Sequence, residues 1–359
     1  MADLMSATTD STKLENKYGN YMVPAIKIKS GGSDLVSTLN LTVLELEIDL
    51  SIDSAGMTVI KLADLYDVES HSFTSKVKSS FKLGTIVEVE IGYLSATTPV
   101  FKGYVAGLGI EFGEIPLIVV KLMDVRKLMM TSGVQRKLYE DKNYSDIFKK
   151  VMKTYSKLCS VECDATSDNL TSPVSQSTND YNFVMNELLR GGKSDREFFV
   201  FMDKAYFRTP AKNKTPIMKL ELGKELIRFE MMADYLDTEI NIVGYDPVNC
   251  KEISAKLKTK TSEACSPVLT PSPPQFFIDP DADTQAKAKS RAEALSRIEL
   301  MNACYASGEL VGLPEIIPGR YIEIKDLDSM ADKKYYICEV RHVISESNFS
   351  TFFEARGWI

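Results

Sequence analysis

Apolar and polar residues alternate through most of the first third of the chain, which is the pattern of strands with one buried face. The pattern is clearest over residues 41–52, where carboxylates at positions 45, 47 and 49 alternate with Leu and Ile. Short strands joined by turns that contain Gly and Ser predict an antiparallel sheet that closes on itself. The segments of this kind are 21–29, 41–52, 57–62, 84–93, 100–112 and 116–122.

Beyond residue 124 the apolar spacing becomes helical. The first helix is expected to have Ser145 as its N-cap, because a serine oxygen can accept a hydrogen bond from a free N–H of the first turn. A second helix is expected to begin at Asn179 and to end at the Gly191-Gly192 pair, a left-handed stop signal. The elements expected in this α+β insertion, residues 125–230, are helices over 144–155 and from 179, and a hairpin over 197–208.

The strand pattern resumes over residues 240–245 and 252–257. A proline-rich stretch then covers 267–280, and its rings fix φ and remove N–H donors, so the interior of a strand or helix does not fit there. A long helix is predicted from an Asp283 cap to about residue 305, with Gly308 ending it. The last strands are expected around 319–324, 335–340, 342–344 and 349–355.

One pattern occurs twice in this sequence. Around Gly84 and again around Gly319, a glycine leads into an alternating strand, a loop and a second strand, with a constant offset of 235 residues. The repetition predicts two copies of one antiparallel barrel, a structural feature suited to building rings. The positions in register are Gly84, Ile86, Glu88, Phe101 and Val105 in the first copy, and Gly319, Tyr321, Glu323, Tyr336 and Val340 in the second.

Composition limits the classes of function. The chain has 359 residues, 44% of them hydrophobic and 26% charged, as in a soluble globular protein of two to three domains. Its net charge of -7, with basic and acidic residues interleaved, argues against a nucleic-acid-binding role. The N-terminus has no signal-peptide pattern, and no stretch approaches the apolar length of a membrane span, so synthesis in the cytoplasm is expected.

The side chains that most often carry catalysis or metals are sparse. The chain has two histidines, His71 and His342, and six cysteines without paired CxxC spacing, so no metal site, cofactor or nucleophile is predicted and the thiols are expected to be free. Glu88 and Glu90 share one face of a predicted strand, which reads as a solvated face and could be the wall of a tube lumen.

Four stretches resemble a known family. They are 119–128, with Asp124; 139–155; 176–188, with Gln176 and the Asn179-Asp180 pair before an apolar helix; and the Gly- and Pro-containing run 308–319. Their order and spacing, around the duplicated hairpin, are similar to those of the phage baseplate hub group. That group includes late control protein D and the N-terminal hub part of the valine-glycine repeat spike of type VI secretion.

The resemblance implies a mainly β, α+β fold with two homologous tube-like barrels and an inserted middle domain. It also implies a homotrimer that presents six barrels to a six-fold tail tube and a three-fold face to a spike. The expected division is a mobile N-terminal arm over 1–20, a first barrel over 21–124, an inserted α+β domain over 125–230, a second barrel over 231–262 with 306–359, and a linker and long helix over 263–305.

The partners implied are further copies of the chain, a tail tube protein and a spike, with a baseplate wedge or tape-measure protein as further candidates. Because the sequence ends at Trp358-Ile359, directly after the second barrel, the spike is expected to be a separate polypeptide. The protein is expected to be made in the bacterial cytoplasm and to become part of a virion tail or an extracellular injection particle.

Two other classes of function stay open from the residues alone. A tail-associated cell-wall hydrolase would need a Cys/His or Glu-based site, and the sequence offers two histidines for it. A receptor-binding or carbohydrate-binding β module would show aromatic residues in loops, whereas most Tyr and Phe here fall at strand positions.

Overall fold

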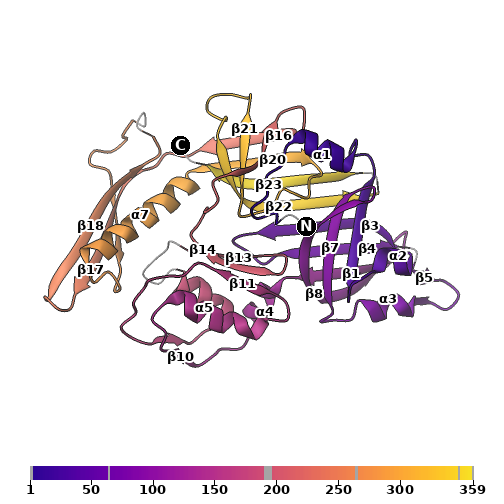
Figure 1. The fold of residues 1–359 in the computed structure, drawn as a ribbon, viewed down its shortest axis with the longest axis horizontal. Helices are drawn as coiled ribbons and strands as arrows, with labels where there is room; N and C mark the ends of the chain where they lie inside the picture. Colours follow the sequence, from indigo (N-terminus) through magenta and orange to yellow (C-terminus); the bar gives the residue numbers. More distant parts are fainter. Residues whose placement is uncertain (1–2, 64, 190–195, 263–265, 347, 358–359) are drawn as a thin grey trace.

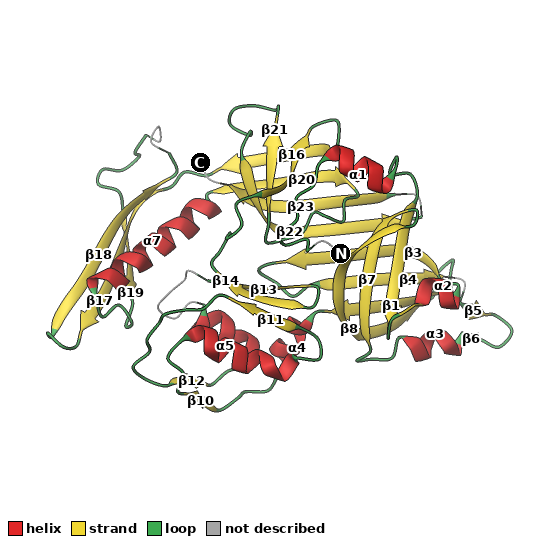
Figure 2. Cartoon of the chain, in the orientation of Figure 1, coloured by secondary structure: helices red, strands yellow, loops and turns green. Residues whose placement is uncertain are grey.

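The computed structural model describes residues 3–63, 65–189, 196–262, 266–346 and 348–357. The fold is mainly β with antiparallel sheets, as predicted (Figures 1 and 2). Its largest sheet has 13 strands, which follow the order β16-β20-β23-β22-β3-β4-β9-β8-β7-β1-β2, while β21 pairs with both β22 and β15 beside this path.

The strands of the large sheet come from both ends of the chain. Those of the N-terminal half are β1 (Pro24–Ser30), β2 (Ser33–Asp34), β3 (Thr42–Ser51), β4 (Met57–Ala63), β7 (Ile86–Tyr93), β8 (Ala96–Glu111) and β9 (Leu117–Met123). Those of the C-terminal half are β15 (Pro216–Glu221), β16 (Leu226–Ala233), β20 (Cys304–Val311), β21 (Tyr321–Lys325), β22 (Lys334–Ser345) and β23 (Phe349–Gly357).

The two halves of the large sheet share one topology. The N-terminal half has the order β1-β7-β8-β9-β4-β3 and the C-terminal half has the order β15-β21-β22-β23-β20-β16. Counted within each half, with the two-residue strand β2 left out, both orders are first, fourth, fifth, sixth, third and second strand. The bulges also correspond: β8 and β9 shift register between Val105 and Gly107, as β22 and β23 do between Ile337 and Glu339. The two halves differ at the first strand, since β1 is antiparallel to β7 and β15 is parallel to β21.

A shared edge joins the halves. Strand β21 covers only the first residues of β22, and the rest of β22, from Glu339 to Ser345, pairs with β3 of the N-terminal half. Two closed barrels were expected, but among the described residues the strand path has two ends, β16 and β2, and no closed barrel is found. The reason is that β22 is longer than its neighbour β21. The backbone N–H and C=O groups of β22 that β21 leaves free are satisfied by a second strand, β3.

The main hydrophobic core lies under this joined sheet and contains residues of both halves, for example Ile48 and Val340. The short elements around it are α2 (Leu35–Leu39), β5 (Tyr66–Asp67), β6 (Ser72–Phe73) and α3 (Ser75–Ser80).

A second core belongs to the middle region, where the rings of Phe148 and Phe207 stack at 4.6 Å between centroids. The helix expected from residue 144 is α5, with Asn143 at its N-cap position but without a side-chain capping hydrogen bond, whereas Ser145 lies inside the helix, is buried and exchanges hydrogen bonds with Thr166. Asn179 caps the second helix, as predicted, whereas the Gly191-Gly192 stop lies outside the described residues. The elements are α4 (Val125–Thr131), β10 (Lys137–Tyr139), α5 (Tyr144–Met152), η1 (Lys153–Tyr155), β11 (Ser160–Cys163), β12 (Val174–Gln176), α6 (Asp180–Phe183), η2 (Val184–Leu188), β13 (Glu197–Phe201) and β14 (Lys204–Arg208).

A third unit projects from the large sheet, at the left of Figure 1. Strands β17 (Asp237–Asp246) and β18 (Lys251–Lys260) were expected in the second barrel, but they pair with each other, and β17 also pairs with β19 (Pro274–Ile278), under helix α7 (Gln285–Asn302). Ala288 and Ala292 let the helix pack closely on β17 and β18, which explains why these strands have a core of their own.

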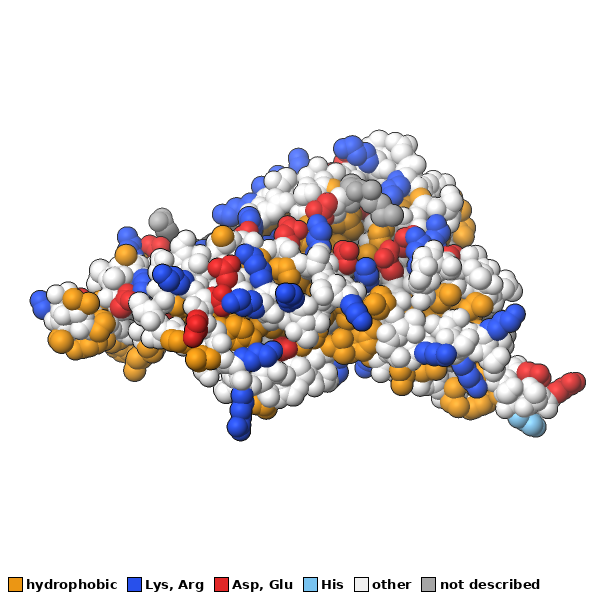
Figure 3. Space-filling model, turned by 60° about the horizontal axis from the view of Figure 1, so that its bottom comes forward, with side chains coloured by type: hydrophobic (Ala, Val, Ile, Leu, Met, Phe, Trp, Pro, Cys, Tyr) orange, Lys and Arg blue, Asp and Glu red, His pale blue; other side chains and the backbone are white. Residues whose placement is uncertain are grey.

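Details of this third unit also differ from the expectation. The cap of α7 is Thr284 instead of Asp283, and Gly308 lies within β20 and not at the helix end. Hydrophobic side chains gather at the far end of the unit (Figure 3), where Val248 and Ile278 are exposed.

The N-terminal segment is not a free arm. Asp10 caps helix α1 (Ser11–Tyr18) by accepting a hydrogen bond from the Lys13 N–H at 2.9 Å, and Leu14 and Tyr18 are buried against the large sheet. The segment reads as polar because its buried apolar residues, Met5, Leu14 and Tyr18, are few and lie among charged and polar ones. The burial comes from tertiary contacts that periodicity does not show.

Candidate functional site

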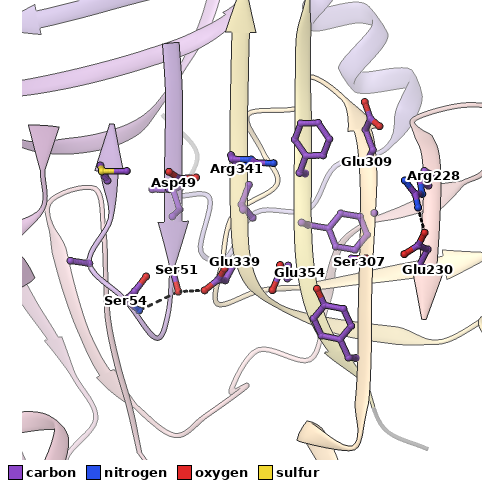
Figure 4. Close-up of a pocket in the computed structure, with 18 of the residues that line it drawn as sticks. Asp49, Ser51, Ser54, Arg228, Glu230, Ser307, Glu309, Glu339, Arg341 and Glu354 are labelled. Atoms are coloured by element: carbon purple, nitrogen blue, oxygen red, sulfur yellow. Dashed lines mark hydrogen bonds and ion pairs between the residues drawn. The ribbon is translucent and has the colours of Figure 1, made fainter. Parts of the chain in front are cut away.

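Charged side chains line one face of the joined sheet (Figure 4). On β3, Leu46, Ile48 and Leu50 enter the core, so the alternate residue Asp49 emerges on the opposite face. On β22, Val340 is buried and Glu339 lies on that opposite face. The alternation recognised in the sequence therefore produces a polar surface that crosses the junction between the two halves.

This surface is hollowed into a groove of about 620 Å³ over β3, β22, β23, β20 and β16. Five carboxylates and two guanidinium groups line it, so the groove is acidic. The carboxylates belong to Asp49, Glu230, Glu309, Glu339 and Glu354, and the guanidinium groups belong to Arg228 and Arg341.

Several of these charged side chains are paired by hydrogen bonds or ion pairs. Arg228 pairs with Glu230 within β16, and Arg341 lies 3.7 Å from Glu47 across the β22–β3 junction. The Ser51 hydroxyl donates a hydrogen bond of 3.0 Å to Glu339 across the same junction. The two contacts across the junction help to fix the register between the two halves on the groove side of the sheet.

Asp49 is the most perturbed carboxyl group of the groove. Burial raises the pKa of Asp49 to about 6, the charge of Glu47 adds to the increase, and Arg341 opposes it. At neutral pH the group is mostly ionised, so the groove presents net negative charge. Such a hydrated acidic wall repels a polyanion by Coulomb interaction and does not retain it.

Two buried thiols of this protein are protonated at neutral pH. Burial raises the pKa of Cys159 and of Cys338 to about 12, so neither supplies a thiolate nucleophile. His342 is buried, with Nδ1 2.9 Å from the Thr351 hydroxyl. Within the described ranges, no group of three or more His, Cys, Asp and Glu side chains could hold a metal ion.

The duplicated glycines occupy the same backbone position. Gly84 and Gly319 have φ of +84° and +82°. The Gly84 N–H donates to the Val105 carbonyl at 2.9 Å, and the Gly319 N–H donates to the Ile337 carbonyl at 2.9 Å. Val105 and Ile337 each return a bond to the residue after the glycine. Each glycine therefore starts a hairpin through one pair of hydrogen bonds.

The second strands of these hairpins match in a different register from the one read in the sequence. The sequence aligns Phe101 with Tyr336, but Tyr336 is opposite Tyr321, and its counterpart Tyr104 is opposite Ile86. The structural match is thus displaced by three residues, and Val105 corresponds to Ile337 instead of Val340. A signal for this register was present, since an aromatic residue followed by a β-branched one occurs at 104–105 and at 336–337.

The glutamates singled out in the sequence lie elsewhere than the acidic groove. Glu88 is opposite Lys102 on β8, and Glu90 is buried in an ion pair with Lys29. Glu323 lies 3.2 Å from Lys325. Sequence reasoning missed the groove carboxylates, although the acidic positions of residues 41–52 were the available signal.

Hydropathy gives one further result. In the portion of the chain that the structure covers, no helix combines the length and the apolar character needed to cross a membrane.

Solved structures with a similar fold include phage tail and type VI secretion proteins. A tail protein from Neisseria meningitidis MC58 matches with a TM-score of 0.69 at 11% identity, over 93% of this chain and 97% of that one. The 43 kDa tail protein of prophage MuSo2 from Shewanella oneidensis matches with a TM-score of 0.69 at 13% identity, over 92% and 98%. The Escherichia coli c3393 protein, a component of the type VI secretion system, matches with a TM-score of 0.53 at 13% identity, over 93% and 77%.

At these identities the likeness shows the fold, which this chain shares with tail proteins along nearly its whole length. No curated protein matches the sequence. One family model, described as the Alg8 N-terminal domain, matches residues 20–346, and this description names no activity. Since the match spans most of the chain, the protein belongs to the Alg8 N-terminal domain family.

Proposed function

We propose that this protein is a structural baseplate hub of a phage tail or of a phage-derived contractile injection particle. The observation that carries the proposal is the repeated strand order with repeated bulges in the two halves of the large sheet. A chain with two equivalent β units can form a trimer with six such units, which matches a six-fold tube on one side and a three-fold spike on the other. The shared fold with two phage tail proteins supports the same assignment.

The proposed division of the chain follows the three cores. Two tube-like β domains, 21–124 and 212–233 with 304–357, form the joined sheet, and residues 125–211 form the inserted α+β domain. The unit over 237–302 is an appendage of the second tube-like domain, inserted between its second strand, β16, and its third strand, β20.

In this proposal the acidic groove faces the conduit. Five carboxylates against two guanidinium groups give a wall that does not bind a passing polyanion. The role is structural and not catalytic. The partners are further copies of this chain, a tail tube protein and a spike, with a baseplate wedge or tape-measure protein contacting the outer units. The particle would be assembled in the bacterial cytoplasm.

The test is the molecular mass of the full chain in solution and its place in particles. Light scattering on the purified protein should give three times the chain mass of 40.1 kDa. Electron microscopy of particles that carry a labelled chain should place the label on the tail axis, at the end of the tube. A stable monomer at micromolar concentration that is also absent from assembled particles would overturn the proposal.

A further inference from the structure

The large sheet has two bare edges. Strand β16 pairs with β20 on one side, and in the described chain it has no strand on the other. Strand β8 is longer than β7, so its residues beyond Val105 pair with β9 alone. Unpaired N–H and C=O groups along a strand edge are a template for another strand.

The junction inside the chain shows what fits such an edge. In the C-terminal half, the corresponding part of β22, from Glu339 to Ser345, is covered by β3. By strand order β3 is the counterpart of β16, and each has a bulge against its neighbour at the same place, between Val43 and Glu45 in β3 and between Leu226 and Arg228 in β16. One chain therefore contains one complete junction, β22 paired with β3. It also contains the two strands of a second junction, β8 and β16, which do not pair with each other within the chain.

Side-chain burial agrees with this correspondence. Counted from the matching hydrogen bonds at Val105 and Ile337, Leu108 and Ile110 of β8 match Val340 and His342 of β22. Val340 and His342 are 1% and 0% exposed, whereas Ile110 is 60% exposed. The bare part of β8 thus carries apolar side chains where the filled junction buries them.

The edge of β16 also exposes apolar side chains, beside its charged pair Arg228 and Glu230. Met232, the counterpart of Asp49, is 65% exposed, and Ile227 is also exposed. Monomeric proteins avoid long, apolar, unpaired strand edges because such edges associate. Both bare edges therefore have the character of buried contact surfaces.

We infer that β16 of one copy of this chain pairs antiparallel with residues 107–111 of β8 of a second copy. The register follows from the internal junction, where Val340 is opposite Leu50 and His342 is opposite Ile48. The equivalent pairs place Leu108 opposite Ala233 of the other copy and Ile110 opposite Met231. Since each chain offers one edge of each kind, the contact is head-to-tail and can close into a ring.

The pairing also continues the acidic groove from one copy to the next. It places Glu111 opposite Glu230 of the other copy, with Arg228 at the diagonal position. Like charges directly opposite are unfavourable, and Arg228, which already pairs with Glu230, offsets them. This inference rests on the proposed hub function for the number of copies in the ring, but not for the register.

Disulfide trapping tests the register. The double variant Leu108→Cys with Ala233→Cys, in a background of Cys250→Ser that removes an exposed thiol, should form covalent oligomers on mild oxidation. Mixing two chains that carry one of these cysteines each should give covalent dimers and no larger species. The matched control is Leu108→Cys with Ile227→Cys, an exposed position six residues along β16 and about 20 Å away, which should give at most a tenth of the product.

A second variant probes the contact without cysteines. Ile110→Asp should weaken self-association at least tenfold in light scattering, whereas Val68→Asp, an exposed residue on the β5–β6 loop, should leave it unchanged. Thermal unfolding checks that both variants fold. A trimer that does not cross-link at 108 and 233, or that withstands Ile110→Asp, overturns the inferred contact and leaves the hub proposal standing. A chain that is monomeric at every concentration and absent from particles overturns both.

Discussion

The two copies of the repeated hairpin have the same backbone but very different surroundings. At Gly84 an added Cβ would meet nothing within 4 Å, whereas at Gly319 it would lie 2.6 Å from Cζ of Phe199. The residue after the glycine is partly exposed in the first copy, as Thr85, and fully buried in the second, as Arg320. At the glycine itself, the second copy is therefore covered by other parts of the described chain and the first copy is not.

Two elements cover it. From the middle region, Arg208 donates hydrogen bonds to the Gly319 carbonyl at 2.6 Å and to Glu197 at 2.8 Å, and the Tyr336 hydroxyl donates to the same carboxylate. From the N-terminal segment, the carbonyls of Leu4 and Ala7 accept hydrogen bonds from Arg320.

This comparison shows how a duplicated unit acquires two roles. The second copy is the place where the N-terminal segment, the middle region and the sheet are held together, so its polar groups are buried and paired. The first copy keeps a bare turn and a bare β8 edge. In the proposed assembly, the first copy supplies the contact between subunits and the second fixes the shape of each subunit.

The largest effect is expected from Arg208→Met. The variant leaves the Glu197 carboxylate buried without its cation, and breaking a buried pair in this way costs about 3–5 kcal/mol. Urea unfolding followed by circular dichroism should show this loss. Lys102→Met, which removes an ion pair of 3.9 Å with the exposed Asp203, should change stability by less than about 1 kcal/mol. Equal effects of the two variants would contradict the unequal roles of the copies.

The paired variants Gly319→Ala and Gly84→Ala compare the two turns directly. Both force a residue with Cβ into positive φ, at about 1 kcal/mol. Gly319→Ala adds a clash with Phe199, so a total of about 2–4 kcal/mol is expected. Thermal and urea unfolding of both variants measure the difference, and a larger loss for Gly84→Ala would refute the environments described above.

Arg320→Met should release the N-terminal segment. Burial lowers the pKa of Arg320 to about 10, so the guanidinium is charged at neutral pH, and its hydrogen bonds to backbone carbonyls are worth about 1.5–3 kcal/mol. Hydrogen exchange of residues 5–18 should become at least tenfold faster, while the middle region stays protected. Thr85→Ala, at the equivalent site of the first copy, should leave exchange unchanged. Unaltered exchange in Arg320→Met would mean that other contacts hold the segment.

The smallest effect is expected at Asp49 of β3, whose counterpart in the C-terminal half of the sheet is Met232 of β16. Since the pKa of Asp49 is raised to about 6 from its ordinary value, the unfolded chain releases this proton at lower pH than the folded one. Stability is therefore lost as pH rises from about 4 to 6. Asp49→Asn should stabilise the protein by about 1 kcal/mol at pH 7.5, after allowance for solvent screening, and by nothing at pH 4. A gain that is the same at both pH values would exclude titration of Asp49 as its cause.

Local sequence patterns determined the elements of this protein. The period of two in residues 41–52 and 57–62 specifies strands with one buried face, and Gly84 and Gly319 specify turns because positive φ favours glycine. Both signals depend on a few neighbouring residues. The same alternation also contained the acidic groove, since the carboxylates of β3 had to emerge opposite its apolar residues.

Tertiary structure decided which strands share an edge. Nothing in the period of β3 says that it pairs with β22, that β17 and β18 leave the large sheet, or that the second hairpin is three residues shorter than the first between its paired positions. The packing of α1 onto the sheet was equally hidden. Hydrogen bonds between strands are made by backbone groups that nearly every residue carries, so they do not identify the partner strand. The sequence pattern determines which face of a strand is buried. The choice of partner depends on the lengths and free edges of distant strands.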